Sequence, residues 1–235
     1  MLDPVVLSAR LSGIRERLAD AARRARRDPA SVRLVAVSKT FPIDAVRACA
    51  ALGQCDFGEN KVQEGLAKSE ATADLSLRWH FIGHLQSNKA KKAVAFDTIH
   101  SIDSEALLIK IDEAAHAAGR TVDVLLQVDL AGEATKFGAT PDQLARLVDT
   151  ANRCTAAQLV GLMTLPPAVD DPEAARPYFA TLREIAERLT PRARHAAMLR
   201  ELSMGMSHDF GVAIEEGATL VRVGSAIFGE REYHA

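Results

Sequence analysis

Short apolar runs alternate with longer amphipathic stretches along the chain. Residues 34–37 carry no polar side chain, and the stretch 122–130 is the longest segment rich in valine and leucine. A continuous apolar run is typical of a parallel strand that is covered on both faces. With the weaker runs included, the pattern predicts eight strands, at residues 34–37, 54–57, 78–82, 98–102, 122–130, 158–163, 201–204 and 220–223.

Helical periodicity separates the predicted strands. We expect helices at residues 43–52, 62–69, 87–94, 105–117, 172–189 and 207–216, and one more that starts at Pro141. Another helix, over residues 5–27, precedes the first strand. Its apolar positions Val6, Ile14, Leu18 and Ala22 fall near one face, which indicates packing against the body of the protein.

Eight strands with helices between them, and no linker, favour an α/β fold that closes into a (β/α)8 TIM barrel. We expect a single domain over residues 1–235, in which residues 1–30 form an N-terminal helix packed on the barrel. An open, doubly wound sheet is the alternative architecture.

Charge and cysteine content restrict the classes of function. The chain has 29 Lys and Arg against 31 Asp and Glu, and this balance does not favour a nucleic acid or an anionic membrane. No apolar window approaches the roughly 18 residues of a membrane span. Cys49, Cys55 and Cys154 lack the spacing of a metal site and indicate reduced thiols, so we expect a cytoplasmic protein without metal.

Lys39 follows the first predicted strand by two residues, in a strand-to-helix loop that ends near Pro42. Barrel enzymes keep their chemistry in such loops. An isolated lysine here usually extends into solvent. If the lysine lies in an apolar opening at the end of the barrel, burial would instead lower the pKa of its amine from the ordinary ~10.4. The neutral amine would then be a nucleophile for an aldehyde.

The loops after strands seven and eight are rich in glycine and serine. Gly205, Gly224 and Gly229 allow close backbone approach, and Ser203, Ser207 and Ser225 add hydroxyl donors. In a barrel these two loops commonly hold a phosphate. A glycine- and serine-rich loop alone usually marks a turn, but two of them facing Lys39 indicate an anion site.

Arg222 lies between two valines of the last predicted strand. If its side chain points into the barrel it must meet an acceptor, because a guanidinium is not left unpaired inside a protein. It could bridge to a carboxylate such as Glu59, reach outward, or donate to a ring nitrogen. An arginine cannot give up its proton, so it would keep a pyridine nitrogen unprotonated.

Six stretches of the chain resemble the pyridoxal phosphate homeostasis proteins, which are single-domain relatives of the alanine racemase barrel. They are VAVSKT at 35–40, FGENKVQE at 57–64, WHFIGHLQSNK at 79–89, GLMT at 161–164, LSMGMS at 202–207 and the segment 221–229. The resemblance implies that Lys39 forms a Schiff base with pyridoxal 5′-phosphate (PLP) and that Arg222 faces its ring nitrogen. The other implied neighbours are Ser203, Gly224 and Ser225 at the phosphate, and Asn60, Met163 and Met204 along the ring.

Two further residues stand near this implied site. His84 could contact the cofactor, although a histidine after a strand more often makes a local hydrogen bond. The loop that contains Lys136 resembles a loop of the family, but Asp129 and Thr135 replace the asparagine and serine common there. A solvated loop lysine is the default interpretation of Lys136.

The resemblance implies a carrier more than an enzyme. Racemase relatives use a tyrosine from a separate C-terminal domain, whereas this sequence ends at Ala235 and has only Tyr178 and Tyr233. We expect no catalytic residues and a monomer that supplies PLP to apo-enzymes, with a weak amino-acid racemase as the alternative. A nucleic-acid- or protein-binding module would rest on Lys89, Lys91 and Lys92, which fit a solvated helix face better.

Overall fold

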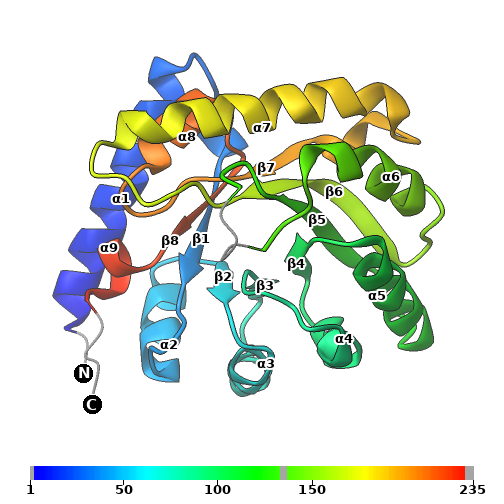
Figure 1. Cartoon of the computed structure of the whole chain (residues 1–235). Coiled ribbons are helices and arrows are strands. Elements are labelled where there is room, and N and C mark those ends of the chain that lie inside the picture. Colours follow the sequence, from blue (N-terminus) through cyan, green and yellow to red (C-terminus); the bar gives the residue numbers. More distant parts are fainter. Residues whose placement is uncertain (1–2, 133–136, 231–235) are drawn as a thin grey trace.

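The computed structural model describes residues 3–132 and 137–230 and shows a closed barrel of eight parallel strands (Figure 1). Neighbouring strands follow the order of the chain, and β8 pairs with β1 to close the ring. The strands are β1 (Arg33–Val37), β2 (Asp56–Glu59), β3 (Arg78–Phe81), β4 (Thr98–Ile102), β5 (Val122–Val128), β6 (Ala157–Thr164), β7 (Glu201–Ser203) and β8 (Leu220–Val223). The (β/α)8 prediction is confirmed, and the open sheet is wrong.

Helices surround the barrel. The α-helices are α1 (Pro4–Arg24), α2 (Ile43–Ala51), α3 (Val62–Ala71), α4 (Ala90–Ala93), α5 (Glu105–Ala117), α6 (Pro141–Ala151), α7 (Arg176–Leu189), α8 (Phe210–Glu215) and α9 (Ser225–Phe228). Short 3-10 turns span Pro29–Ser31, Ser87–Lys89, Pro172–Ala175, Thr190–Arg192 and Ala196–Leu199. Within residues 3–132 and 137–230, no helix combines the length and apolar character needed to cross a bilayer.

Side-chain caps fix several helix starts. Asp3 accepts the Val5 N–H at 2.8 Å before α1, and the Ser104 hydroxyl accepts the Leu107 N–H before α5. These bonds satisfy N–H groups that have no partner within the helix.

Several boundaries differ from the predicted ones. Strand β2 ends at Glu59 and not at residue 57, because Gly58 and Glu59 pair with β3. Strand β5 stops at Val128, since the Asp129 carboxylate turns the chain by accepting two following N–H groups. The helix predicted at 207–216 begins only at Phe210. The predicted helices at 87–94 and 172–189 each open with a 3-10 turn before the α-helix begins.

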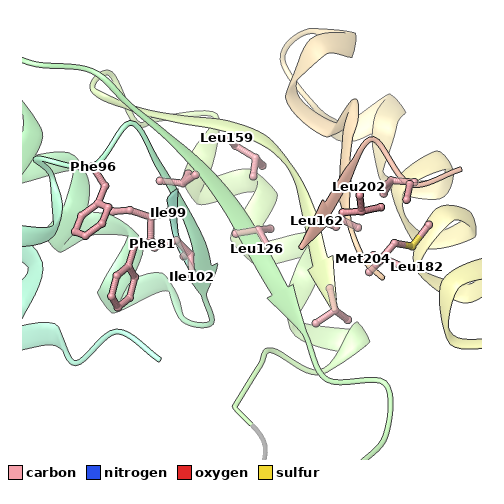
Figure 2. Packing of buried hydrophobic residues seen from close by; sticks show 14 of the residues in the cluster. Phe81, Phe96, Ile99, Ile102, Leu126, Leu159, Leu162, Leu182, Leu202 and Met204 are labelled. Atoms are coloured by element: carbon pink, nitrogen blue, oxygen red, sulfur yellow. The ribbon is translucent and has the colours of Figure 1, made fainter. Parts of the chain in front are cut away.

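The main apolar core lies between the strands and the surrounding helices. Leu126, Leu162 and Leu202 occupy neighbouring positions on β5, β6 and β7 and form part of it (Figure 2). At the left of Figure 2, the rings of Phe81 and Phe96 meet edge to face, with their centroids 5.4 Å apart. Since side chains alternate along a strand, the residues between these apolar positions point into the barrel.

Helix α1 packs against α8 and α9 (Figure 1). Its buried face includes Ile14, Leu18 and Ala22 as predicted, together with Leu7 and Leu11. The predicted member Val6 is instead 41% exposed, because it lies beside that face and not on it.

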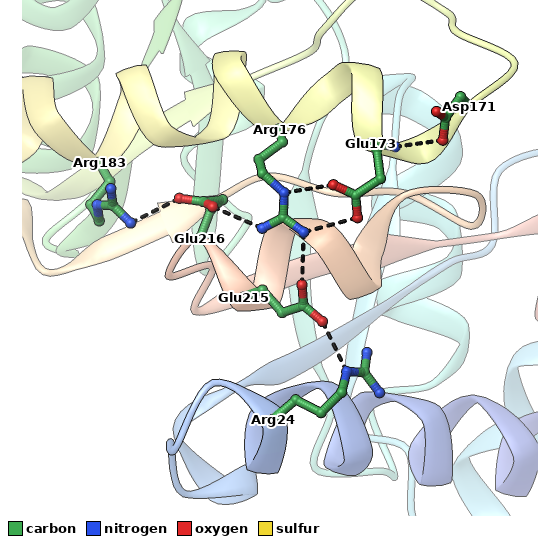
Figure 3. Close-up of polar contacts among 7 residues, drawn as sticks. All are labelled: Arg24, Asp171, Glu173, Arg176, Arg183, Glu215 and Glu216. Atoms are coloured by element: carbon green, nitrogen blue, oxygen red, sulfur yellow. Dashed lines mark hydrogen bonds and ion pairs between the residues drawn. The ribbon is translucent and has the colours of Figure 1, made fainter.

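An ion network joins α1, α7 and α8 (Figure 3). Glu215 accepts from Arg24 at 2.9 Å and from Arg176 at 2.8 Å, and Glu216 accepts from Arg176 and Arg183. Of these pairs only Arg24–Glu215 reaches α1, and a largely exposed pair of this kind contributes little, about 0–1 kcal/mol.

Candidate functional site

Lys39 and Gly224 lie at the same end of the barrel. Strands β1 and β8 are parallel, with Ala36 opposite Val223, so both chains leave the sheet side by side. A Cβ atom placed on Gly224 would come within 3.2 Å of the Val37 carbonyl oxygen. The absence of a side chain at Gly224 therefore lets the last loop approach the strand that carries Lys39.

The backbone on both sides of Lys39 is held by α3. Thr40 has a positive φ of 71°, which is strained for a β-branched residue, and its N–H donates to Glu64 at 2.7 Å. On the other side, the Ser38 hydroxyl donates to Glu59 at 2.7 Å, and the Ser38 carbonyl accepts from Lys68 at 2.8 Å. These bonds fix the loop from which the Lys39 side chain, itself half-buried, extends.

A buried ion cluster holds the groups that bind the backbone on both sides of Lys39. The Lys68 amine is 2.7 Å from Glu59 and 2.8 Å from Glu64. Burial raises the pKa of Glu59, and hydrogen bonds from Lys68 and Ser38 offset only part of that rise. Burial also tends to raise the pKa of Glu64, but the bonds from Lys68 and the Thr40 N–H outweigh it, so this pKa is lowered.

Local sequence patterns did not predict this cluster. Its one local signal is the spacing of Glu64 and Lys68 by four residues, which places both side chains on one face of a helix. The suggestion that Glu59 could pair with Arg222 is wrong, because Glu59 bonds to Ser38 and to Lys68 on α3.

The Arg222 side chain points into the barrel and is 4% exposed, which excludes the outward alternative. Its Nη1 donates to the Ser203 hydroxyl and its Nη2 donates to the Thr164 carbonyl at 2.9 Å. Burial lowers the pKa of Arg222 to about 10, although the charge of Asp209 acts in the opposite direction. At neutral pH the guanidinium still carries its charge.

The three residues implied for the phosphate occupy two different settings. Gly224 and the exposed Ser225 lie at the barrel rim, where the Ser225 hydroxyl is 3.3 Å from that of Ser207. Ser203 is fully buried, and its hydroxyl contacts both Arg222 and His100 in the barrel interior.

The three residues implied along the ring also differ. Met163 is fully buried and packs with Val35, Leu125 and Leu220. Met204 belongs to the apolar layer outside the strands, close to Leu202 in Figure 2.

Asn60 follows β2 at the rim and is half-buried. Within the described residues its Oδ1 atom is buried without a hydrogen-bond partner. A buried acceptor of this kind costs free energy unless a donor satisfies it. This atom therefore fits a site that is completed by a ligand. A cavity of about 200 Å³ also opens at Asn60, but its lining does not include Lys39, Arg222 or Gly224.

His84 makes local contacts. Its ring stacks on Phe137 with centroids 3.5 Å apart, and its Nδ1 is 3.8 Å from the Asp103 carboxylate. These contacts join the loops that follow β3, β4 and β5. Lys136 and Thr135 lie outside the described residues.

The sequence matches a known family over most of its length. The family model described as "Alanine racemase, N-terminal domain" matches residues 10–232. The pyridoxal phosphate homeostasis protein of Aquifex aeolicus is 44% identical over 225 residues, which cover 95% of this chain and 98% of that protein. The protein of the same name from Pseudomonas aeruginosa is 42% identical over 230 residues, 97% of each chain.

Solved structures agree with these matches. PipY of Synechococcus elongatus PCC7942, solved with PLP bound, is 40% identical with a TM-score of 0.84, over 95% of this chain and all of that one. An alanine racemase from Clostridium difficile 630 is 13% identical with a TM-score of 0.74, over 99% of this chain and 58% of that one. The second match shows a shared fold.

Proposed function

This chain belongs to the pyridoxal phosphate homeostasis protein family, and from that membership we propose that it binds PLP reversibly and takes part in intracellular PLP homeostasis. One observation carries the proposal. Lys39, which can react with an aldehyde, and the Gly224 loop, which can approach a phosphate, open at the same rim of one barrel. The PLP-bound structure of PipY supports the choice of ligand.

In this proposal each residue holds a different part of the cofactor. The Lys39 amine would attach to the aldehyde carbon with loss of water, while Gly224 and Ser225 would bind the phosphate through backbone and hydroxyl donors. Asn60 and Met163 would line the ring, whereas Met204, which was expected beside them, lies in the outer apolar core. Ser203 acts on the cofactor through Arg222, to which it is hydrogen-bonded.

Arg222 favours a carrier over an enzyme. Bound PLP supplies an electron-withdrawing ring that can stabilise a carbanion, and this ability is greatest when its nitrogen is protonated. An arginine offers only donors, so it keeps that nitrogen unprotonated and weakens the ring as an electron sink. We propose that exchange of the ligand at Lys39 is the main chemistry of the protein.

The setting of this function is also part of the proposal. We propose that residues 1–235 work as one PLP-binding domain, as a monomer in the cytoplasm, and deliver PLP to apo-enzymes that require it. Nucleic acid and membrane are not among the proposed partners.

Replacing Lys39 by alanine is expected to abolish the imine absorption near the visible edge and the retention of PLP on a desalting column. Lys91→Ala, at an exposed position on α4, serves as the matched control and should retain both. Circular dichroism checks that both variants are folded. If the Lys39 variant kept an absorption that a carbonyl reagent removes, another amine would be the attachment point.

The alternative function, weak amino-acid racemization, has a direct test. The PLP-loaded protein is incubated with L-alanine and other L-amino acids, and the D-isomers are quantified by chiral chromatography. We expect no turnover above that of free PLP. Turnover well above this background, lost in the Lys39 variant, would support the enzyme instead.

A further inference from the structure

A chain of hydrogen bonds crosses the barrel interior behind Arg222. The hydroxyl of Ser203 on β7 contacts His100 Nδ1 on β4 at 2.8 Å, and His100 Nε2 contacts His80 Nδ1 on β3 at 2.9 Å. His80 Nε2 then contacts Asp56 on β2 at 2.9 Å. All five residues are less than a tenth exposed. Side chains from five of the eight strands are thus joined in one line.

The chemistry of the groups gives this line a direction. Arg222 can only donate, so the Ser203 oxygen accepts from it and the Ser203 hydrogen is available to His100 Nδ1. If both imidazoles are neutral, one arrangement of protons satisfies every contact. In that arrangement His100 donates through Nε2 to His80, and His80 donates through Nε2 to Asp56.

The charges at the two ends fit this arrangement. Burial lowers the pKa of His100 well below its ordinary value, and the nearby His80 and Arg222 act in the same direction. Burial raises the pKa of Asp56, but bonds from His80 and from Arg78, at 2.6 Å, bring it below its ordinary value. The line therefore runs from a cation at Arg222 to an anion at Asp56.

Packing alone does not require these polar side chains. The same barrel interior also contains an apolar cluster of Val35, Leu125, Met163 and Leu220. Replacing a buried ion pair by apolar residues of similar volume is often neutral or stabilising. Fully satisfied networks, in contrast, fix the geometry of their members.

We propose that His100, His80 and Asp56 are positioning residues for the cofactor ring. They orient the Ser203 hydroxyl so that it accepts from Arg222, which holds the guanidinium in place and favours its charged form. This inference rests on the proposed function, because the group that Arg222 addresses is the pyridine nitrogen of PLP. This hydrogen-bonded line, which we call the relay, then determines how strongly that nitrogen is bound.

The test uses two ligands and two substitutions at one position. The ligands are PLP and its 1-deaza analogue, in which carbon replaces the ring nitrogen. His100→Leu removes both contacts of His100, whereas the amide of His100→Gln can accept from Ser203 and donate to His80. His100→Leu should weaken PLP binding about tenfold while leaving the affinity for the analogue unchanged. His100→Gln should restore most of the loss.

Equal losses for both ligands would show that His100 only supports the fold, and no loss would show that the relay does not act on Arg222. A third measurement needs neither a variant nor a ligand. In the unmodified protein, ¹⁵N NMR should show both histidines neutral, with the proton on Nε2. An imidazolium at His80 would overturn the proposed direction. If the unmodified protein failed to bind PLP, the proposed function would fail. The NMR result would still decide whether the hydrogen bonds of the relay run in the proposed direction.

Discussion

Replacing Lys68 by methionine is expected to lower the free energy of unfolding by roughly 3–5 kcal/mol, which is the usual cost of breaking a buried ion pair. Lys68 is 5% exposed, and its amine binds Glu59, Glu64 and the Ser38 carbonyl. Glu59 is fully buried, so its carboxylate would keep its desolvation cost without the cation that offsets it. Urea unfolding followed by fluorescence measures the change.

The pH dependence of this loss identifies its cause. Burial already holds the folded-state pKa of Glu59 above its ordinary value of ~4.3, and loss of the bond from Lys68 would raise it further. Stability that depends on the protonated form is present below the unfolded pKa and is lost as the pH rises. The deficit should therefore be smaller at pH 4.5 than at pH 7, and a deficit independent of pH would point to lost packing.

The control for Lys68 is the same change at an exposed lysine. Lys92→Met, on α4, should alter the free energy of unfolding by less than about 0.5 kcal/mol. If Lys68→Met cost no more than about 1 kcal/mol, the value of an exposed pair, the cluster would not be the anchor of the Lys39 loop.

Gly161→Ala is expected to destabilise the protein by about 3 kcal/mol, at the upper end of the usual cost of overpacking. Gly161 on β6 lies opposite Glu201 on β7, and an added Cβ would come within 1.8 Å of the Glu201 carbonyl oxygen. A backbone atom cannot turn away as a side chain can, so β7 must shift. Because β7 carries Ser203, PLP affinity should fall as well.

Gly13→Ala provides the matched control for this change. Gly13 lies inside α1, and a Cβ there meets no atom within 4 Å. It should stabilise the protein by roughly 0.5–1 kcal/mol, because alanine loses less backbone entropy in a helix. Thermal unfolding of both variants measures the contrast. Equal melting temperatures would contradict the close approach of β6 and β7.

The barrel was predictable because its signals are local. Apolar runs located all eight strands, and parallel pairing then required Lys39 and Gly224 to share one rim. The end of β2 was missed because the sequence Phe-Gly-Glu at 57–59 is typical of a turn, whereas pairing with β3 extends the strand through it. Tertiary pairing here outweighs local propensity.

The interior contacts could not be read from local patterns. His80 and His100 are 20 residues apart, and Ser203 lies 103 residues beyond His100, so only closure of the ring brings them together. The sequence does contain a weak signal. His80 stands between the outward-facing apolar residues Trp79 and Phe81, which places a polar side chain on the inner face.

The packing of α1 has a consequence for how the protein is made. The apolar face of this helix is covered by α8 and α9, which the ribosome synthesises about 185 residues later. Until then, Leu7, Leu11 and Ile14 are exposed on the nascent chain and can be recognised by chaperones. The partner that shields the first helix and the strand that seals the ring, β8, both follow the first seven strands in the order of synthesis.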